Sequence, residues 1–392
     1  MQRTYFQLVK NRIEEQRKFI QVLYGPRQVG KTTLIKQVLS AINVPYLFAT
    51  ADDIVGADNV WLRNLWDRAR LLQKKEKCDV VLAVDEVQKV QNWSEVVKKE
   101  WDTDTFNDVP IKVVILGSSS LLIQQGFTES LSGRFESIYI DHWSYKEMHD
   151  AFGLSVDEFI WFGGYPGAAT LISDETRWKR YIKNSLIDTS VSKDILMMTR
   201  IEKPALLRRL FEIGCSYSAQ ILSLTKIQGE LMEKGNITTL SNYLSLLKSA
   251  GLICGLGKYS GDIIRKRSSK PKFQVFNNAL LSAQSEHTFS EALADGKFWG
   301  RLFESAVGAY LLNKSYTEDY DLYYWNENSM EVDYVLQKGS KVVAIEVKSG
   351  KDSSNIGMDI FNNKFHPSAS FIVGTDGIPA EEFLQINPND LF

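Results

Sequence analysis

The sequence predicts an α/β fold, and three observations carry that prediction. Apolar residues from Phe19 to Leu23 form a short buried strand that runs into a glycine-rich loop and then into a helical pattern. The run from Asp79 to Glu86 is an apolar strand that ends in two acids, as the buried strands of parallel sheets often read. Alternation of polar and apolar residues over 331–348 predicts a second sheet. At 392 residues, the chain is long enough for two or three domains.

Composition limits the functional classes. Lys and Arg total 46 against 48 acidic residues, for a formal charge of -2, so no global field attracts nucleic acid or an anionic membrane. The three cysteines, Cys78, Cys215 and Cys254, form no CxxC pair, which argues against a zinc knuckle or a disulfide framework. The N-terminus lacks a signal peptide's apolar core, and no apolar run is long enough to span a bilayer. We expect a cytoplasmic protein that does not contact membranes.

The glycine-rich loop predicts a nucleotide site. Residues 25–32 read GPRQVGKT between a strand and a helix, which is the context that gives the GxxxxGK[ST] pattern its meaning. Its glycines let backbone N–H groups surround phosphates, Lys31 reaches the terminal phosphates, and the Thr32 hydroxyl suits Mg²⁺. The sequence therefore predicts ATP and Mg²⁺ as cofactors. The expected nucleotide-binding residues are Gly25, Pro26, Arg27, Gln28, Val29, Gly30, Lys31, Thr32 and Thr33.

Polar residues at the ends of neighbouring strands complete this prediction. Asp85 is expected to hold Mg²⁺ through water and Glu86 to polarise the attacking water, although two such acids can also cap a helix. A third apolar strand, 111–116, runs into GSSS, which makes Ser118 or Ser119 a candidate γ-phosphate sensor or a helix cap. Arg134 is a candidate arginine finger from a neighbouring subunit, with a surface salt bridge as the competing interpretation. As a finger, Arg134 would require a homo-oligomer.

Residues 17–147 resemble the AAA-type ATPases (AAA_14) of a prokaryotic family whose C-terminal half carries a domain of unknown function, DUF4143. The matching segments are 25–33, 84–88, 117–120, 131–134 and 162–166. The resemblance implies a P-loop AAA-type parallel-sheet domain over 1–150 that binds and hydrolyses ATP, followed by a helical linker or lid over 151–200.

The middle of the chain predicts a winged-helix domain over 201–285. Amphipathic helices over 223–234 and from Thr238 to Gly251 are followed by a hairpin whose connection is strongly basic. Thr238 is the expected cap of the second helix, and Gly251 its C-terminal glycine. The expected nucleic-acid contacts are Arg265, Lys266, Arg267, Lys270 and Lys272, with exposed Ser241, Asn242, Ser245 and Lys248 on the second helix. A cationic hairpin can equally be solvated, or pack against a partner subunit.

The C-terminal strands predict a pair of carboxylates on one face. Gly339 and Ser340 suit a two-residue hairpin turn, which pairs Lys338 with Lys341 and places Asp333 opposite Glu346. Like charges in that position need compensation, and a divalent cation is the candidate. Lys348 falls on the same face. An exposed edge hairpin is the competing interpretation.

This Asp and Glu-x-Lys pattern resembles the PD-(D/E)xK nuclease fold, which implies an α/β nuclease-like domain over 286–392. The resemblance assigns Glu304, Asp333, Glu346 and Lys348 to the catalytic site, with Asp333 and Glu346 as metal ligands. The combined prediction is an ATPase that acts on nucleic acid, with DNA the expected form, coupled to a Mg²⁺-dependent nuclease. One alternative is a nucleotide-controlled switch whose nuclease-like domain only binds DNA or protein. A third is a remodeller of proteins in which the C-terminal acids are structural.

Overall fold

The computed structural model describes residues 2–53, 56–118, 131–191, 195, 201–230, 236–260, 269–350 and 356–392. The chain forms two compact units, Met1–Ile140 and Asp141–Phe392. Within the described ranges, no helix combines the length and the apolar character needed to cross a membrane.

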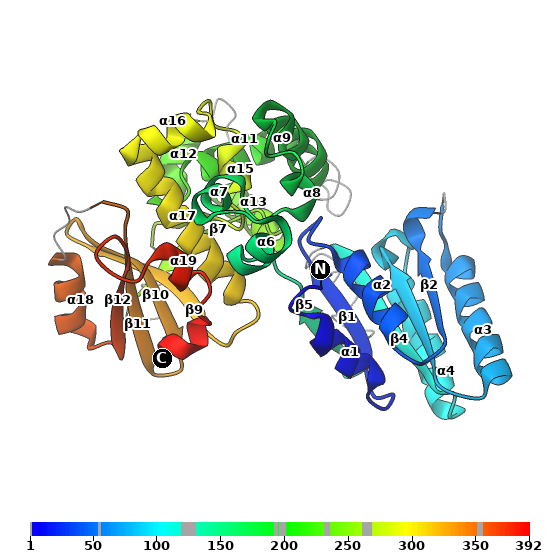
Figure 1. The fold of residues 1–392 in the computed structure, drawn as a ribbon. Coiled ribbons are helices and arrows are strands. Elements are labelled where there is room, and N and C mark those ends of the chain that lie inside the picture. Colours follow the sequence, from blue (N-terminus) through cyan, green and yellow to red (C-terminus); the bar gives the residue numbers. More distant parts are fainter. Residues whose placement is uncertain are drawn as a thin grey trace. The chain divides into compact units, whose positions relative to one another are not determined.

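The first unit alternates helices with strands (Figure 1). Its strands are β1 (Ile20–Gly25), β2 (Tyr46–Thr50), β3 (Val80–Asp85), β4 (Ile111–Ser118) and β5 (Phe135–Tyr139). Its helices are α1 (Phe6–Glu14), α2 (Lys31–Ala41), α3 (Asn59–Glu76) and α4 (Trp93–Phe106), with short 3-10 turns at Ala51–Asp53 and Val87–Lys89.

The five strands form one parallel sheet in the order β2-β3-β4-β1-β5. Apolar side chains of α1 and α2 pack on one face, and those of α3 and α4 pack on the other. Because both faces are covered, β3 and β4 are buried along their whole length, which explains their continuous apolar runs. The parallel order brings the carboxyl ends of β1, β3 and β4 to one edge, where the predicted nucleotide residues lie.

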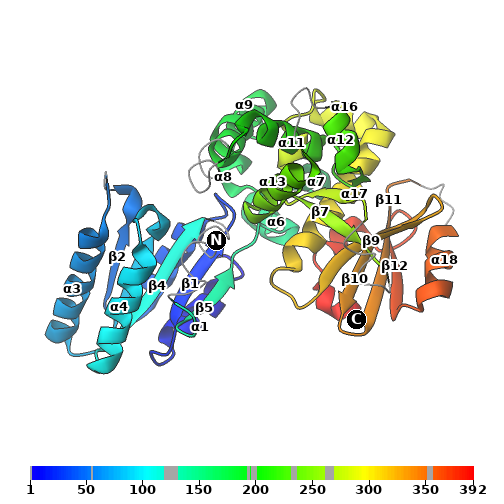
Figure 2. The same cartoon turned by 180° about the vertical axis from the view of Figure 1, so that it is seen from behind.

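The second unit begins with helices, and its strands occur from residue 220 onward with further helices between and after them (Figure 2). Its helices are α6 (Tyr145–Phe152), α7 (Val156–Phe162), α8 (Pro166–Ala169), α9 (Glu175–Tyr181), a π-helical turn (Ile182–Ile187), α11 (Pro204–Ser216), α12 (Leu224–Glu230), α13 (Ile237–Ser249), α15 (Ala279–Ser282), α16 (Phe289–Ala294), α17 (Gly296–Lys314), α18 (Ile356–Phe365), α19 (Ala380–Phe383) and a 3-10 turn (Pro388–Leu391). Its strands are β6 (Gln220–Ile221), β7 (Ile253–Lys258), β8 (Lys272–Val275), β9 (Asp321–Glu327), β10 (Met330–Lys338), β11 (Lys341–Lys348) and β12 (Ala369–Gly374).

These strands make a seven-stranded sheet in the order β12-β11-β10-β9-β7-β8-β6. Helix α17 covers one face of β10 and β11 through Tyr334, Val343 and Ile345, whereas α18 covers the other through Val335 and Ala344. The hairpin of the middle segment thus continues the C-terminal sheet, because β7 pairs with β9 in parallel. Segments predicted as separate, 151–200, 201–285 and 286–392, contribute to one hydrophobic cluster.

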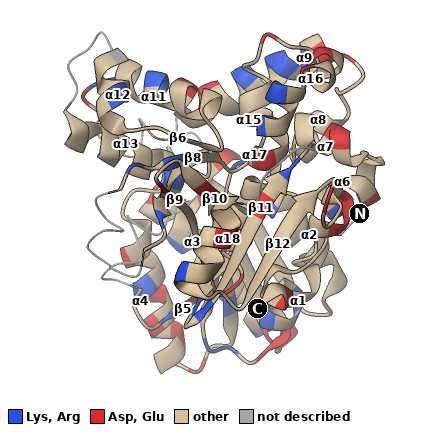
Figure 3. Ribbon diagram, turned by 90° about the vertical axis from the view of Figure 1, so that its left-hand side faces the viewer, with Lys and Arg blue, Asp and Glu red and all other residues tan. Residues whose placement is uncertain are grey.

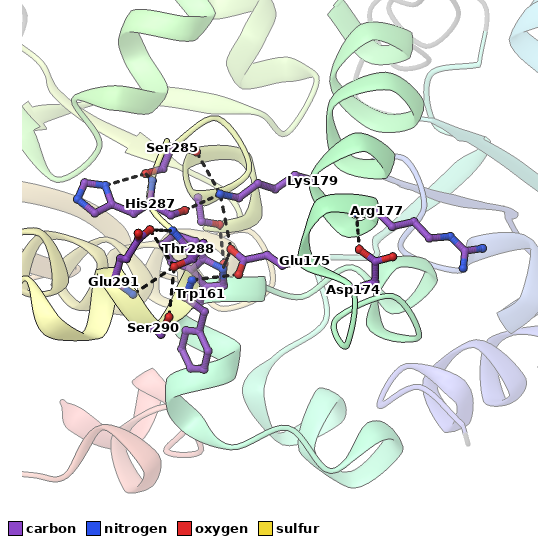
Figure 4. A network of polar contacts seen from close by, with 12 residues as sticks. Trp161, Asp174, Glu175, Arg177, Lys179, Ser285, His287, Thr288, Ser290 and Glu291 are labelled. Carbon is purple, nitrogen blue, oxygen red and sulfur yellow. Dashed lines mark hydrogen bonds and ion pairs between the residues drawn. The ribbon is translucent and has the colours of Figure 1, made fainter.

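Polar contacts also join these segments (Figure 4). Lys179 of α9 donates to the backbone oxygens of Ser285 and His287, and Glu175 accepts from the indole of Trp161 and the N–H of Phe289. Side chains of α9 therefore bind backbone groups from Ser285 to Phe289, and Glu175 also joins α9 to α7 through Trp161.

The predicted hairpin register is confirmed for the five residue pairs next to the turn, and the predicted pairing of Asp333 with Glu346 lies just beyond the last of them. Lys338 pairs with Lys341, Tyr334 pairs with Ile345, and Gly339 has a φ of +58°, as the turn requires. The predicted cap of the helix in the middle segment is wrong by two residues. Asn236, rather than Thr238, caps α13 by accepting the N–H of Thr239 at 2.7 Å. Gly251 follows the helix with a φ of +68°, the conformation expected of a terminating glycine.

Candidate functional site

The loop between β1 and α2 provides a concave backbone surface. Gly25 has a φ of +151°, Gln28 a φ of +58° and Gly30, at the start of α2, a φ of +89°. Left-handed residues among ordinary ones turn neighbouring N–H groups toward one side, where they can bind an anion. A Cβ on Gly25 would lie 2.0 Å from the carbonyl oxygen of Ile140, so space as well as conformation requires glycine there.

Lys31 is buried at the first turn of α2. Its Nζ donates hydrogen bonds to the carbonyl oxygens of Gly25 at 2.9 Å and Pro26 at 2.7 Å. Burial lowers the pKa of Lys31 to about 8, against the opposing effect of the Glu86 and Asp85 carboxylates. A bound phosphate would favour the charged amine, because an adjacent anion stabilises the protonated form.

Thr32 and Asp85 meet at the carboxyl edge of the sheet. The Thr32 hydroxyl donates to Asp85 Oδ2 at 2.5 Å across 53 residues of sequence. Asp85 is nearly fully buried, and its Oδ1 accepts the N–H of Glu86 at 2.9 Å. A hydroxyl beside a carboxylate is an oxygen donor set that suits Mg²⁺, which takes few protein ligands and keeps its waters. These two residues therefore fit the Mg²⁺ that the sequence predicts.

Glu86 belongs to a short hydrogen-bonded chain that sequence reasoning missed. Gln88 donates from Nε2 to Glu86 Oε2 at 2.5 Å and to the Ser118 hydroxyl at 3.4 Å. Burial raises the pKa of Glu86, Asp85 raises it further, and the bond from Gln88 opposes both. Gln88 thus connects the predicted base to Ser118, which is buried at the end of β4. Ser119 lies outside the described residues.

Arg3 is a second contact that no motif indicated. Its guanidinium donates to the Val29 carbonyl at 2.7 Å, and the residue is buried. Its positive charge also helps to lower the pKa of Lys31. Arg3 therefore supports the loop from a position 26 residues upstream, a contact that only the fold creates.

Arg134 forms an ion pair within its own chain. Its Nε and Nη2 donate to the two carboxylate oxygens of Asp102 at 2.7 and 2.9 Å. This is the salt bridge that competes with the finger role. A role for Arg134 in a neighbouring subunit would require it to leave Asp102, and stays a prediction.

The predicted C-terminal residues converge in the second unit. Glu304 comes from α17, Asp333 from β10, and Glu346 and Lys348 from β11. The Lys348 ammonium lies 2.6 Å from Glu346 Oε1, and the charge of Asp333 acts on both Glu304 and Glu346. Burial, followed by the charge of Asp333, raises the pKa of Glu304 to about 8 and that of Glu346 to about 7.

Lys272 corrects the predicted nucleic-acid surface. Its side chain is fully buried, and its Nζ lies 2.6 Å from Glu304 Oε1, 3.1 Å from Glu331 Oε1 and 3.5 Å from Asp333 Oδ1. The reason is that β8 pairs with both β6 and β7, so its first residue is interior rather than at a wing tip. Arg265, Lys266 and Arg267 lie outside the described residues. Lys270 is exposed.

The acidic cluster does not fit a divalent metal as it stands. Glu304 and Glu331 are paired with Lys272, and Asp333 Oδ2 accepts the N–H of Val347 at 2.8 Å. In the described part of the chain, no three His, Cys, Asp or Glu side chains are arranged to hold a metal ion. The compensating charge that the sequence assigned to a divalent cation comes from a lysine.

A polar groove of about 560 Å³ lies between α12, α13 and the β7–β8 hairpin. Lys248 and Lys270 line it, and none of the described residues that line it is acidic. Its hydroxyl groups come from Ser223, Thr225, Ser241, Ser245 and Ser269. The groove therefore offers positive charge and hydrogen-bond donors together.

Three segments of the chain match known families. Residues 17–149 match the family described as "AAA domain". Residues 154–290 match a domain of unknown function (DUF8612), and residues 299–382 match another (DUF4143). An uncharacterized protein of Methanocaldococcus jannaschii is 26% identical over 339 residues, which cover 81% of this chain and 72% of that protein.

Solved structures resemble the chain only distantly. Cdc6p from Pyrobaculum aerophilum has a TM-score of 0.34 and 11% identity, covering 64% of this chain and 86% of its own. The RuvB Holliday junction branch migration motor of Thermotoga maritima has a TM-score of 0.33 and 17% identity, covering 64% and 85%. AMPPCP-bound DnaA from Aquifex aeolicus has a TM-score of 0.32 and 15% identity, covering 63% and 87%. Likeness at this level supports no inference about function. The match over 17–149 agrees with the AAA-type domain expected from the sequence, with a P-loop at its sheet edge.

Proposed function

We propose that the chain is a P-loop ATPase whose nucleotide state controls nucleic-acid binding by the second unit. The observation that carries the proposal is the meeting of Lys31, Thr32, Asp85 and Glu86 at one sheet edge. Each has the chemistry that phosphoanhydride hydrolysis needs: a cation for phosphate, a hydroxyl and a carboxylate suited to Mg²⁺, and a second carboxylate for water.

The residues divide the work as follows. The loop N–H groups and Lys31 would bind the phosphates, and Thr32 with Asp85 would hold Mg²⁺, which supplies charge neutralisation when bound. Glu86 would orient and deprotonate the attacking water, since its raised pKa brings it nearer to that of a useful base. Gln88 would hold Glu86 in position. Ser118, which accepts the second hydrogen bond from Gln88, would contact the terminal phosphate.

One surface of the second unit favours nucleic acid as the partner. Helix α11, strand β6, helices α12 and α13, and the β7–β8 hairpin follow one another in the order of a winged helix, which favours that prediction. The described residues that line the groove beside α13 include lysines and hydroxyls and no acids, as expected of a phosphate-binding surface. Lys248 and Lys270 are the residues we assign to nucleic acid.

The nuclease alternative rests on the same C-terminal residues. Convergence of Glu304, Asp333 and Glu346 supports it. The fully buried Lys272 among them opposes it, since the ammonium already neutralises the carboxylates that would hold a metal. We therefore favour a second unit that binds nucleic acid without cutting it.

Three measurements separate these functions. DNA-stimulated ATP hydrolysis should disappear in a Lys248→Ala/Lys270→Ala double variant and persist in the control Lys341→Ala, an exposed lysine on the hairpin turn outside the groove. The salt dependence of DNA binding should fall by about 0.9 in log–log slope for each lost phosphate contact. Mg²⁺-dependent plasmid nicking that is abolished by Asp333→Ala would instead establish the nuclease.

ATP hydrolysis itself has its own controls. Lys31→Ala should lose nucleotide binding. Glu86→Gln should retain binding while hydrolysis falls by about 10²- to 10⁴-fold, the usual contribution of a general base. Full hydrolysis by Lys31→Ala would overturn the assignment of the site.

A further inference from the structure

The buried Lys272 raises a question that the ATPase does not answer: why an ammonium lies inside a β-sheet. Charged side chains are rarely buried, because removing them from water costs more than most contacts return. Lys272 begins β8, the strand between β6 and β7, and its side chain is fully buried. The protein groups around the ammonium must therefore supply nearly all of the interactions that water would otherwise make with it.

Oxygen atoms surround the ammonium on several sides. Nζ donates hydrogen bonds to Glu331 Oε1 at 3.1 Å and to the backbone oxygen of Asp333 at 3.2 Å. Glu304 Oε1 lies 2.6 Å away in an ion pair rather than a well-directed hydrogen bond. Two of the three N–H donors of the ammonium group therefore have hydrogen-bond acceptors, and the Glu304 carboxylate adds a close opposite charge. The Tyr334 ring, with its centroid 4.9 Å from Nζ, adds a favourable aromatic face.

The carboxylates of this cluster also have partners within the protein. Four acids gather here, Glu304, Glu331, Asp333 and Glu346, together with two lysines, Lys272 and Lys348. Figure 3 colours the ribbon by charge, with basic segments in blue and acidic segments in red around β8 and β10. Asp333 Oδ2 is bound to the N–H of Val347, and Glu346 Oε1 is bound to Lys348. Among the described atoms of this cluster, Glu304 Oε1 and Glu346 Oε2 are buried carboxylate oxygens with no hydrogen-bond partner. The ammonium groups of Lys272 and Lys348 already lie 2.6 Å from Glu304 Oε1 and Glu346 Oε1, beside the carboxylates that Mg²⁺ would need.

We propose that the Lys272 ammonium is the permanent cation of this acidic cluster, so that the second unit holds its four carboxylates together without a divalent metal. A metal close enough to bind Glu304 and Asp333 would lie within a few ångströms of Nζ, where two cations repel each other strongly in a buried site. Removing the ammonium should convert the cluster into a site for Mg²⁺ or Mn²⁺. Lys272 thus decides whether this acidic cluster is a metal centre.

The test is Mn²⁺ binding to the full-length chain without nucleotide, measured by electron paramagnetic resonance of the free ion. Every protein carries Asp85→Asn, which removes the carboxylate assigned to Mg²⁺ in the nucleotide site. With Lys272 present, Asp333→Asn should leave Mn²⁺ binding unchanged. Lys272→Met should gain one Mn²⁺ per chain, and adding Asp333→Asn to it should abolish that gain. Lys314→Met, which removes a partly buried lysine paired with Asp141, should gain none.

The outcomes are decisive even when a variant does not fold. If Lys272→Met unfolds, the test is the comparison of the two proteins that keep Lys272, one with Asp333 and one with Asp333→Asn. Equal Mn²⁺ binding by these two proteins supports the proposal. Mn²⁺ that binds with Lys272 present and is lost in Asp333→Asn overturns it. A folded Lys272→Met that gains no Mn²⁺ also overturns the claim that the lysine occupies a metal position. Because nucleotide is absent, no result here depends on the proposed ATPase.

Discussion

The ammonium of Lys31 lies 2.7 Å from the carbonyl oxygen of Pro26, inside the loop that the sequence predicts for phosphate binding. The contact holds the lysine beneath the loop, with the charge near the surface that would receive the anion. It also leaves the amine buried, which is why its pKa falls to about 8. A phosphate would replace two weak acceptors with a stronger one.

This relationship predicts that nucleotide affinity falls as pH rises through about 8. A lowered pKa means that Lys31 loses its charge above that pH in the free protein, and binding must then take up a proton. Between pH 7 and pH 9 the affinity for MgADP should weaken about tenfold, the equivalent of one pKa unit. Isothermal titration at the two pH values measures it. Lys31→Met should bind weakly with no such change, and an equal pH dependence in that variant would contradict the assignment.

Gln88 should affect the pKa of Glu86, the proposed general base. Its hydrogen bond lowers the pKa of Glu86, against burial and Asp85. In Gln88→Ala the acidic limb of the pH profile for kcat should therefore move to higher pH, while MgADP affinity stays unchanged. Gln7→Ala, at an exposed position on α1, is the control and should leave the profile in place. A drop in kcat with an unmoved profile would mean that Gln88 affects something other than the protonation of Glu86.

The Arg134 and Asp102 pair permits a test of assembly. The pair is partly exposed to solvent, so Arg134→Ala should change the free energy of unfolding by no more than about 1 kcal/mol. If the guanidinium serves a neighbour's nucleotide site, mixing Arg134→Ala with Lys31→Ala should restore part of the ATP hydrolysis that each lacks. Absence of any recovery, with both variants shown to associate, would count against a shared site.

Lys272 should be essential to the stability of the second unit. Lys272→Ala leaves carboxylates buried without their cation, which costs about 3–5 kcal/mol when one partner of a buried pair is removed. The loss should be smaller near pH 4.5 than at pH 8. Glu304 and Glu346 have raised pKa values in the folded chain, so their favourable contribution exists below the unfolded value and disappears as pH rises through about 7 to 8. Urea unfolding at both pH values, with Lys314→Ala as the control, measures this difference.

Sequence reasoning succeeded where geometry is local. The loop over 25–33 and the hairpin over 331–348 are contiguous, so residue spacing alone determines their conformation and register. Sequence reasoning failed where the hydrogen-bond partner of a residue comes from a distant segment of the chain. Nothing near Gln88 indicates Ser118, and nothing near Arg3 indicates Val29.

Lys272 shows a second kind of failure. In sequence it ends a basic run and looks like part of an exposed wing, but β8 is paired on both sides and its first residue faces inward. The same packing supplied the positive charge for which the sequence suggested a metal. Strand order is a long-range property, and a residue's burial follows from it.

The central claim is that nucleotide state controls nucleic-acid binding. The most direct measurement is the affinity of Glu86→Gln for duplex DNA, compared in MgATP and in MgADP by fluorescence anisotropy. We predict affinities that differ by about fivefold or more, the lower end of typical coupling between sites, with both states weakened by Lys248→Ala/Lys270→Ala. Equal affinity in the two nucleotide states, or DNA binding that ignores both lysines, would contradict the account.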